Sequence, residues 1–176
     1  ADVSANEEMA KKLGYSKVSL MKLDVAKTIY DYVRRGGFLF SMCSAPETID
    51  IALAADGVDI VPREFDSDPV DPGCQEKLDF SKTFAFENFE ITTDPLLYRH
   101  SNIDTYPDRQ IRFPRTTDDF FYLFDFAAKL DPVPTMLTQD HVNTVNGFMG
   151  QTTGFRKSLL KKFVTILAQP DNYDEV

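Results

Sequence analysis

The stretch "FLFSMCSAPETIDIALAADG" (residues 38–57) joins an apolar run to a helix-like segment through a short turn. Residues 38–42 are apolar at nearly every position, which is typical of a strand buried on both faces of a parallel sheet. Pro46 is favoured in the first turn of a helix, and Ser44 is a suitable N-cap ahead of it. The pattern predicts a buried strand, a turn at Cys43 and a helix.

The sequence before this stretch predicts another helix. In "SLMKLDVAKTIYDYVRRGG" (residues 19–37) apolar residues recur at near-helical spacing, and Gly36 or Gly37 supplies a left-handed stop. Gly57 is a comparable terminator for the helix after Cys43. Helix, strand, tight turn and helix in this order are typical of a doubly wound α/β fold.

The rest of the chain predicts shorter elements around a loop-rich middle section, residues 62–118, which is acidic and rich in proline. Aromatic crowding in residues 118–130 is compatible with either a helix or a strand. Alternating or continuous apolar residues predict strands over residues 82–92, 110–113, 143–153 and 163–169.

Composition limits the class of protein and of partner. The chain has 176 residues, 43% of them hydrophobic, and a net charge of −9, which predicts one globular domain over residues 1–176. The acidic balance argues against nucleic acid, whose phosphates require clustered lysine and arginine. No apolar run approaches the roughly 18 residues of a membrane span. We expect a small-molecule substrate or a protein partner, and the oligomeric state is open.

Cys43 is the candidate nucleophile. A thiol between a strand and a helix N-terminus is favoured as thiolate, and backbone N–H groups near Ser44 would form an oxyanion hole. Ser41 and Ala45 are small, as the neighbours of a tight nucleophile turn must be. The alternative is that Cys43 packs as a small apolar residue, as unpaired cysteines commonly do.

A nucleophilic cysteine also needs a base, and the chain has two histidines, His100 and His141. His141 follows Asp140 near the end of an apolar segment and is the stronger candidate, whereas His100 lies in a polar loop. Glu47 either orients a group in the site or favours the positive end of its helix. The predicted catalytic set is therefore Cys43, His141 and Glu47.

Metal and cofactor sites have little support. Asp66, Asp68 and Asp71 could supply oxygen ligands to calcium, but their spacing differs from an EF-hand, and a solvated acidic turn explains them as well. The chain contains no cysteine–histidine cluster with zinc-ligand spacing and no glycine-rich phosphate loop. We therefore expect no metal and no cofactor.

Four segments resemble a bacterial family labelled asparagine synthetase B: residues 7–33, 36–55, 131–141 and 147–155. The segments "MCSA…DIALAA" and "FMGQTT" are the most distinctive. The resemblance implies a class I glutamine amidotransferase-like (ThuA-like) domain, which is a flavodoxin-like three-layer sandwich with a mostly parallel sheet and here a loop-rich insertion. Members are longer and carry secretion signals, which implies a fragment of a longer protein and an extracytoplasmic (periplasmic) location.

The resemblance implies Cys-dependent hydrolysis or amide-nitrogen transfer, with Cys43 at the nucleophile position. The flanks of Cys43 depart from the family's glycines, and the chain has neither a His-x-Glu motif nor the pyrophosphate loop of a glutamine-dependent asparagine synthetase. The alternative is a non-catalytic binding or assembly module on the same fold. An exposed Cys43 favours the enzyme; a buried Cys43 with an exposed aromatic surface, for which residues 118–126 are the candidate, favours the module.

Overall fold

The computed structural model describes residues 3–97, 99–105, 120–123, 144–146, 154–170, 174 and 176. The chain divides into two units, Ala1–Asn102 and Ile103–Val176. The prediction of a single domain over residues 1–176 stays a prediction.

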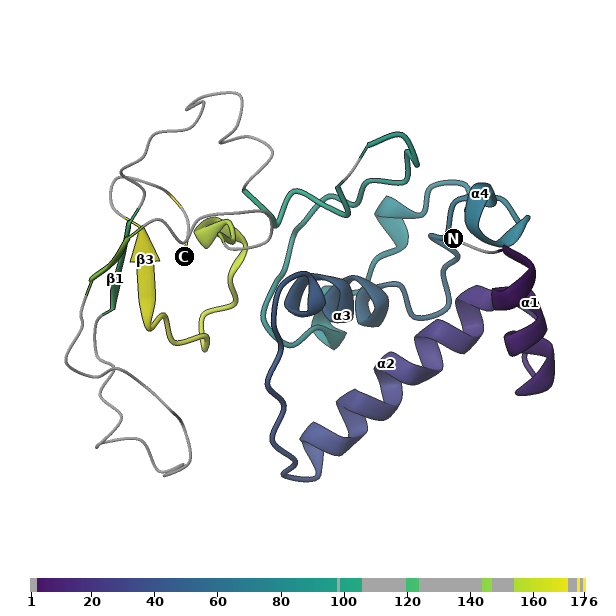
Figure 1. Cartoon of the computed structure of the whole chain (residues 1–176), viewed down its shortest axis with the longest axis horizontal. Helices are drawn as coiled ribbons and strands as arrows, with labels where there is room; N and C mark the ends of the chain where they lie inside the picture. Colours follow the sequence, from purple (N-terminus) through teal and green to yellow (C-terminus); the bar gives the residue numbers. More distant parts are fainter. Residues whose placement is uncertain are drawn as a thin grey trace. The chain divides into compact units, whose positions relative to one another are not determined.

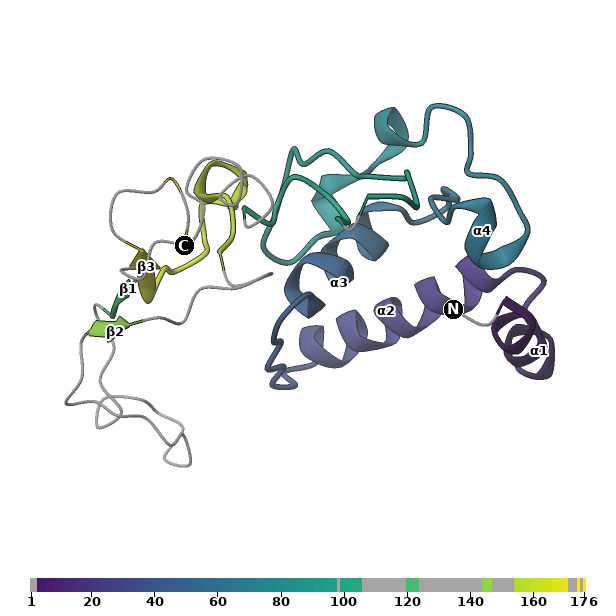
Figure 2. The same cartoon turned by 45° about the horizontal axis from the view of Figure 1, so that its top comes forward.

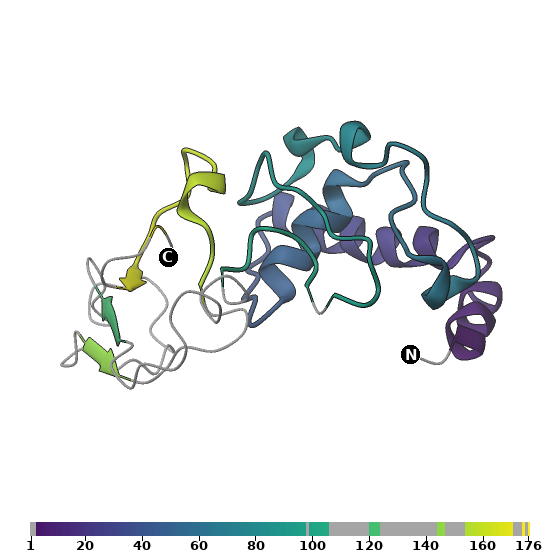
Figure 3. The same cartoon turned by 90° about the horizontal axis from the view of Figure 1, so that it is seen from above.

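The first unit is built from helices and irregular chain (Figures 1 and 2). Its elements are α1 (Val3–Lys12), α2 (Val18–Arg34), α3 (Ala45–Ala54), the one-turn α4 (Arg63–Asp66) and the 3-10 turns η1 (Gln75–Lys77) and η2 (Phe80–Lys82). Helix α3 packs on α2, and α1 lies beside α4 (Figure 3). Across the described ranges, no helix combines the length and hydropathy that a bilayer crossing needs.

The two predicted helices are confirmed. Helix α2 ends at Arg34, and Gly36 follows with φ +90° and donates its N–H to the Val33 carbonyl at 2.9 Å. Helix α3 begins at Ala45 with Pro46 in its first turn. Ser44 occupies the N-cap position, but its side chain makes no capping hydrogen bond. Proline and glycine therefore marked these boundaries correctly, whereas the predicted serine cap did not form.

The predicted strand over residues 38–42 is wrong. These residues belong to no helix or strand, and their large apolar side chains are exposed to solvent. The exposed fractions are 67% for Phe38, 66% for Phe40 and 67% for Met42. A central strand of a parallel sheet would be buried on both faces.

The predicted flavodoxin-like three-layer sandwich with a mostly parallel sheet is wrong for the same reason. In the described part of the first unit there is no strand at all. The apolar segment after α3 bonds to the acidic loop: the Asp59 N–H donates to Asp71 Oδ2 at 3.0 Å, and the Asp71 N–H donates to the Asp59 carbonyl at 2.8 Å. The segment after α3 is therefore held against the acidic loop by these two bonds and belongs to no strand.

The predicted half-exposed strand over residues 82–92 is also wrong. The segment is irregular, with one isolated bridge between Ile91 and Ser101. Phe86 and Phe89 are 2% and 0% exposed, and the Phe89 ring meets Phe80 edge-on with centroids 4.9 Å apart. These rings form the core beneath α3.

The loop over residues 84–86 is held by a side chain of α3. The Asp50 carboxylate is 1% exposed and accepts three backbone N–H bonds, from Phe84 at 2.6 Å, Ala85 at 2.7 Å and Phe86 at 2.8 Å. Hydrogen bonds to the charged form compensate the burial of a carboxylate. We call this arrangement the Asp50 clamp.

The described part of the second unit contains a three-stranded antiparallel sheet in the order β2-β1-β3 (Figure 2). Its strands are β1 (Phe120–Leu123), β2 (Thr144–Asn146) and β3 (Ala168–Pro170), and the 3-10 turn η4 covers Lys157–Leu159. Residues 118–130, compatible with a helix or a strand by sequence, therefore contain a strand. The predicted strand over 110–113 lies outside the described residues.

Candidate functional site

Cys43 lies in a tight turn between residues 38–42 and α3. Its side chain is exposed and its φ is +59°, in the left-handed region that residues other than glycine rarely adopt. The Ala45 N–H donates to the Met42 carbonyl at 3.1 Å and closes the turn. The backbone therefore presents the thiol to solvent at the beginning of a helix.

Few backbone N–H groups at the start of α3 are available as hydrogen-bond donors near Cys43. The Ala45 N–H is engaged by Met42, and Pro46 has no N–H. The Ser44 N–H is the next donor along the chain from Cys43.

Glu47 occupies a different environment from Cys43. Its side chain is 0% exposed, and the Ser101 hydroxyl donates to Glu47 Oε1 at 2.6 Å. Ser101 is itself fully buried. The contact ties α3 to the end of the loop over residues 91–101, so Glu47 anchors the helix that carries the Cys43 turn.

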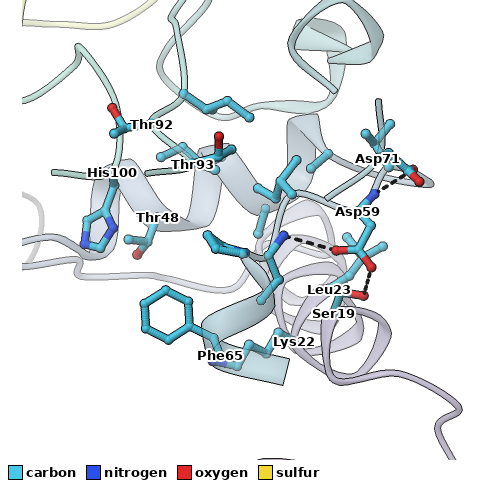
Figure 4. Close-up of a pocket in the computed structure, with 18 of the residues that line it drawn as sticks. Ser19, Lys22, Leu23, Thr48, Asp59, Phe65, Asp71, Thr92, Thr93 and His100 are labelled. Carbon is cyan, nitrogen blue, oxygen red and sulfur yellow. Dashed lines mark hydrogen bonds between the residues drawn. The ribbon is translucent and has the colours of Figure 1, made fainter. Parts of the chain in front are cut away.

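The two histidines are placed differently. His141 lies outside the described residues, so its pairing with Cys43 stays a prediction. His100 is exposed and lines a pocket in the first unit, where Figure 4 shows it close to Thr48 of α3. The pocket lining does not include Cys43.

The pocket has a volume of about 710 Å³ and lies among α2, α3, residues 57–65 and the loop over residues 91–100 (Figure 4). Its walls are mainly aliphatic and aromatic: Leu20, Leu23, Ile51, Val58, Val61 and Phe65. Sequence reasoning missed this pocket. The available signal was the apolar spacing within the two helices, Leu20 with Leu23 and Ile51 with Ala55, but nothing in it indicated a hollow between them.

In one corner of the pocket, polar side chains form hydrogen bonds and ion pairs with one another. The Asp59 carboxylate accepts bonds from the Ser19 hydroxyl at 3.0 Å and the Val61 N–H at 3.1 Å, and the Lys17 ammonium lies 3.4 Å away. Lys17 also pairs with Asp68. The hydrogen bond to Asp68, and to a smaller extent the one to Asp59, raises the pKa of Lys17 above its ordinary value.

The acidic loop at residues 66–71 is not arranged as a metal site in the described part of the chain. No three or more His, Cys, Asp or Glu side chains converge there as ligands. Asp68 faces Lys17, Asp71 accepts the Asp59 N–H, and Asp66 is 7% exposed. Burial raises the pKa of Asp66 above its ordinary value.

Comparison of the chain with protein-family models, curated proteins and solved structures gives no match. The resemblance to the family labelled asparagine synthetase B therefore stays a prediction.

Proposed function

We propose that Cys43 of this chain performs thiol-dependent amide hydrolysis or amide-nitrogen transfer. The observation that carries the proposal is the exposed Cys43, held at φ +59° directly before α3. A non-glycine residue in this conformation costs about 1–3 kcal/mol, and such strain is concentrated at functional sites. The resemblance described above supports the same residue.

The proposed chemistry proceeds in two steps. The Cys43 thiolate attacks the carboxamide carbonyl, and the S–C bond forms as the C–N bond breaks; the nitrogen leaves as ammonia after taking a proton from the base. Water then hydrolyses the thioester, and the thiol is restored. The Ser44 N–H donates to the developing oxyanion.

His141 is the base in this proposal, because it follows Asp140 and a thiol needs a proton acceptor near neutral pH. Glu47 is a positioning residue, since its buried carboxylate binds Ser101 and fixes the first turn of α3. Its contribution is to the geometry of the turn at Cys43.

The test is the rate of iodoacetamide labelling at pH 7, read by mass spectrometry on folded protein, with Cys74 as the internal control. Cys74 is half-buried and precedes only the three-residue 3-10 turn η1, not an α-helix. We expect Cys43 to label at least tenfold faster than Cys74, and His141→Asn to remove that advantage. Labelling of Cys43 only after unfolding would overturn the proposal, as would ammonia release from L-glutamine at an unchanged rate in Cys43→Ser.

A second candidate function, a non-catalytic assembly module, is favoured by the exposed run at residues 38–42. In this case a second copy of the chain covers Phe38 and Phe40. Light scattering would then show concentration-dependent self-association that Phe38→Ser/Phe40→Ser removes. A monomer at all concentrations would exclude it. The side chains of the predicted aromatic surface at residues 118–126 lie outside the described part of the molecule.

A further inference from the structure

We propose that the pocket of the first unit binds an uncharged, mainly apolar small molecule that carries a hydroxyl or carbonyl group. This site is separate from Cys43, which does not line it. The inference does not depend on the proposed thiol chemistry.

The walls of the pocket determine the body of the ligand. Its volume of about 710 Å³ is within the range of small-molecule sites, about 300–1,000 Å³. Leu20 and Leu23 of α2 and Ile51 of α3 line the pocket, together with Val61 and Phe65. A ligand with an apolar body removes this surface from water, which is the main source of affinity in such sites.

The charges around the pocket favour an uncharged ligand. The lining contains three cationic side chains, Lys17, Lys22 and Arg99, and three carboxylates, Asp59, Asp71 and Asp94. The three carboxylates already accept hydrogen bonds from the protein: Asp59 from Ser19 and Val61, Asp71 from Asp59, and Asp94 from Leu96. Lys17 is paired with Asp59 and Asp68. Each lining carboxylate therefore already accepts a hydrogen bond, and the equal numbers of cationic and anionic side chains select neither a cation nor an anion.

The opposite end of the pocket supplies the polar recognition. Figure 4 shows Thr92, Thr93 and His100 together there, away from Asp59. Within the described residues, their hydroxyl and imidazole groups make no side-chain hydrogen bond, whereas the Thr48 hydroxyl is bonded to the Ser44 carbonyl at 2.9 Å. Hydroxyl and neutral imidazole groups both donate and accept, so they match a hydroxyl or a carbonyl.

The test uses Nile red, an uncharged aromatic dye with one carbonyl, whose fluorescence rises in apolar surroundings. We expect saturable binding at one site of the full chain. Ala52 lines the pocket, and Ala52→Phe fills it, so this variant should bind at least tenfold more weakly. The control is Phe38→Ser/Phe40→Ser, which removes the exposed apolar run outside the pocket and should leave binding unchanged.

The polar end is tested by Thr92→Val/Thr93→Val, which keeps the side-chain shape and removes both hydroxyls. Binding should weaken about threefold to tenfold, whereas Thr28→Val on the exposed side of α2 should have no effect. Thr93→Phe serves as a second filling variant if circular dichroism shows that Ala52→Phe unfolds α3. Unchanged Nile red binding in a folded filling variant would overturn the site. Tighter binding of the anionic dye anilinonaphthalenesulfonate to the same site would overturn the ligand class.

Discussion

Residues 38–42 and α3 are separated only by the turn at Cys43, yet the first segment exposes apolar side chains whereas the second buries two carboxylates. Phe38 and Phe40 are 67% and 66% exposed, whereas Glu47 and Asp50 are 0% and 1% exposed. Both segments have strong local signals, one for a buried strand and one for a helix. The difference lies in the partners that each segment finds elsewhere in the chain.

Helix α3 finds polar partners that are distant in sequence. Asp50 bonds to the backbone of residues 84–86, and Glu47 bonds to Ser101. These bonds offset the desolvation of two carboxylates. Residues 38–42 find no neighbouring strand among the described residues, and their apolar side chains remain in water. Burial here is decided by complementary partners more than by side-chain hydropathy.

The largest expected effect is the removal of the Asp50 clamp. Asp50→Ala removes the shared acceptor of three backbone N–H groups, one buried and two part-buried, and we expect it to lower the free energy of unfolding by about 3–5 kcal/mol. Urea unfolding followed by the far-UV helical signal measures it. The control is Asp31→Ala on the exposed face of α2, expected within about 0.5 kcal/mol of the parent chain. Equal effects of the two variants would show that the buried carboxylate does not organise the loop.

A smaller loss is expected from the second buried contact of α3. Ser101→Ala removes the donor to Glu47 Oε1 inside the protein and should cost about 1–2 kcal/mol. The matched control is Ser81→Ala, which removes the exposed 2.6 Å bond to Asp79 and should cost less than about 0.5 kcal/mol. If both serines gave the same loss in urea unfolding, burial would not be the deciding difference.

Asp56 near the end of α3 tests how much a half-exposed carboxylate contributes. Its bond to Lys82, followed by that to Lys27, lowers its pKa below the ordinary value of 3.8. Asp56→Asn should therefore cost about 0.5–1 kcal/mol at pH 7. Because a lowered pKa contributes stability above the unfolded value, this cost should disappear as the pH falls through the folded pKa. A cost that is unchanged in acid would contradict the ion pairs.

Replacing Asp66 should change the stability at pH 7 in the opposite direction from replacing Asp56. Burial raises its pKa above 3.8, and its Oδ2 accepts no hydrogen bond in the described part of the structure. A raised pKa means that stability is lost as the pH rises through the folded value, so Asp66→Asn should stabilise the chain by about 0.5–1 kcal/mol at pH 7. The difference from the parent should vanish below about pH 3.8. Destabilisation at pH 7 would contradict this assignment.

The smallest effect is expected at residues 38–42. Phe38→Ser/Phe40→Ser changes side chains that are about two-thirds exposed, so the free energy of unfolding should shift by no more than about 0.5 kcal/mol. Phe89→Ala, at a fully buried ring, should by contrast cost about 3–5 kcal/mol. A large loss from the double serine variant would show that these residues are buried in the molecule in solution.

Local signals predicted what is decided within a few residues. Helical spacing and Gly36 located the end of α2, and Pro46 located the start of α3. The sheet was predicted wrongly because a strand exists only with a neighbour, and residues 38–42 have none among the described residues. The alternation of residues 82–92 was misleading because Asp50, at least 34 residues away, holds that backbone in an irregular path.

In the candidate site, too, only the features decided within a few residues could be predicted. The position of Cys43 between an extended segment and a helix follows from the order of residues, and the structure adds its exposure and left-handed backbone. The burial of Glu47 could not be predicted, because its partner Ser101 lies 54 residues away. The pocket has no sequence motif, since its walls come from four separate segments.

The Asp50 clamp also couples the motions of two segments. The Asp50 carboxylate belongs to α3 and accepts the backbone N–H bonds of residues 84–86. When the middle of α3 unfolds, the loop therefore loses these three hydrogen bonds. The amide hydrogens of Phe84, Ala85 and Phe86 should therefore exchange with deuterium at the opening free energy of α3, as one cooperative unit. An irregular loop would in this way acquire the slow exchange that is ordinarily found in helices.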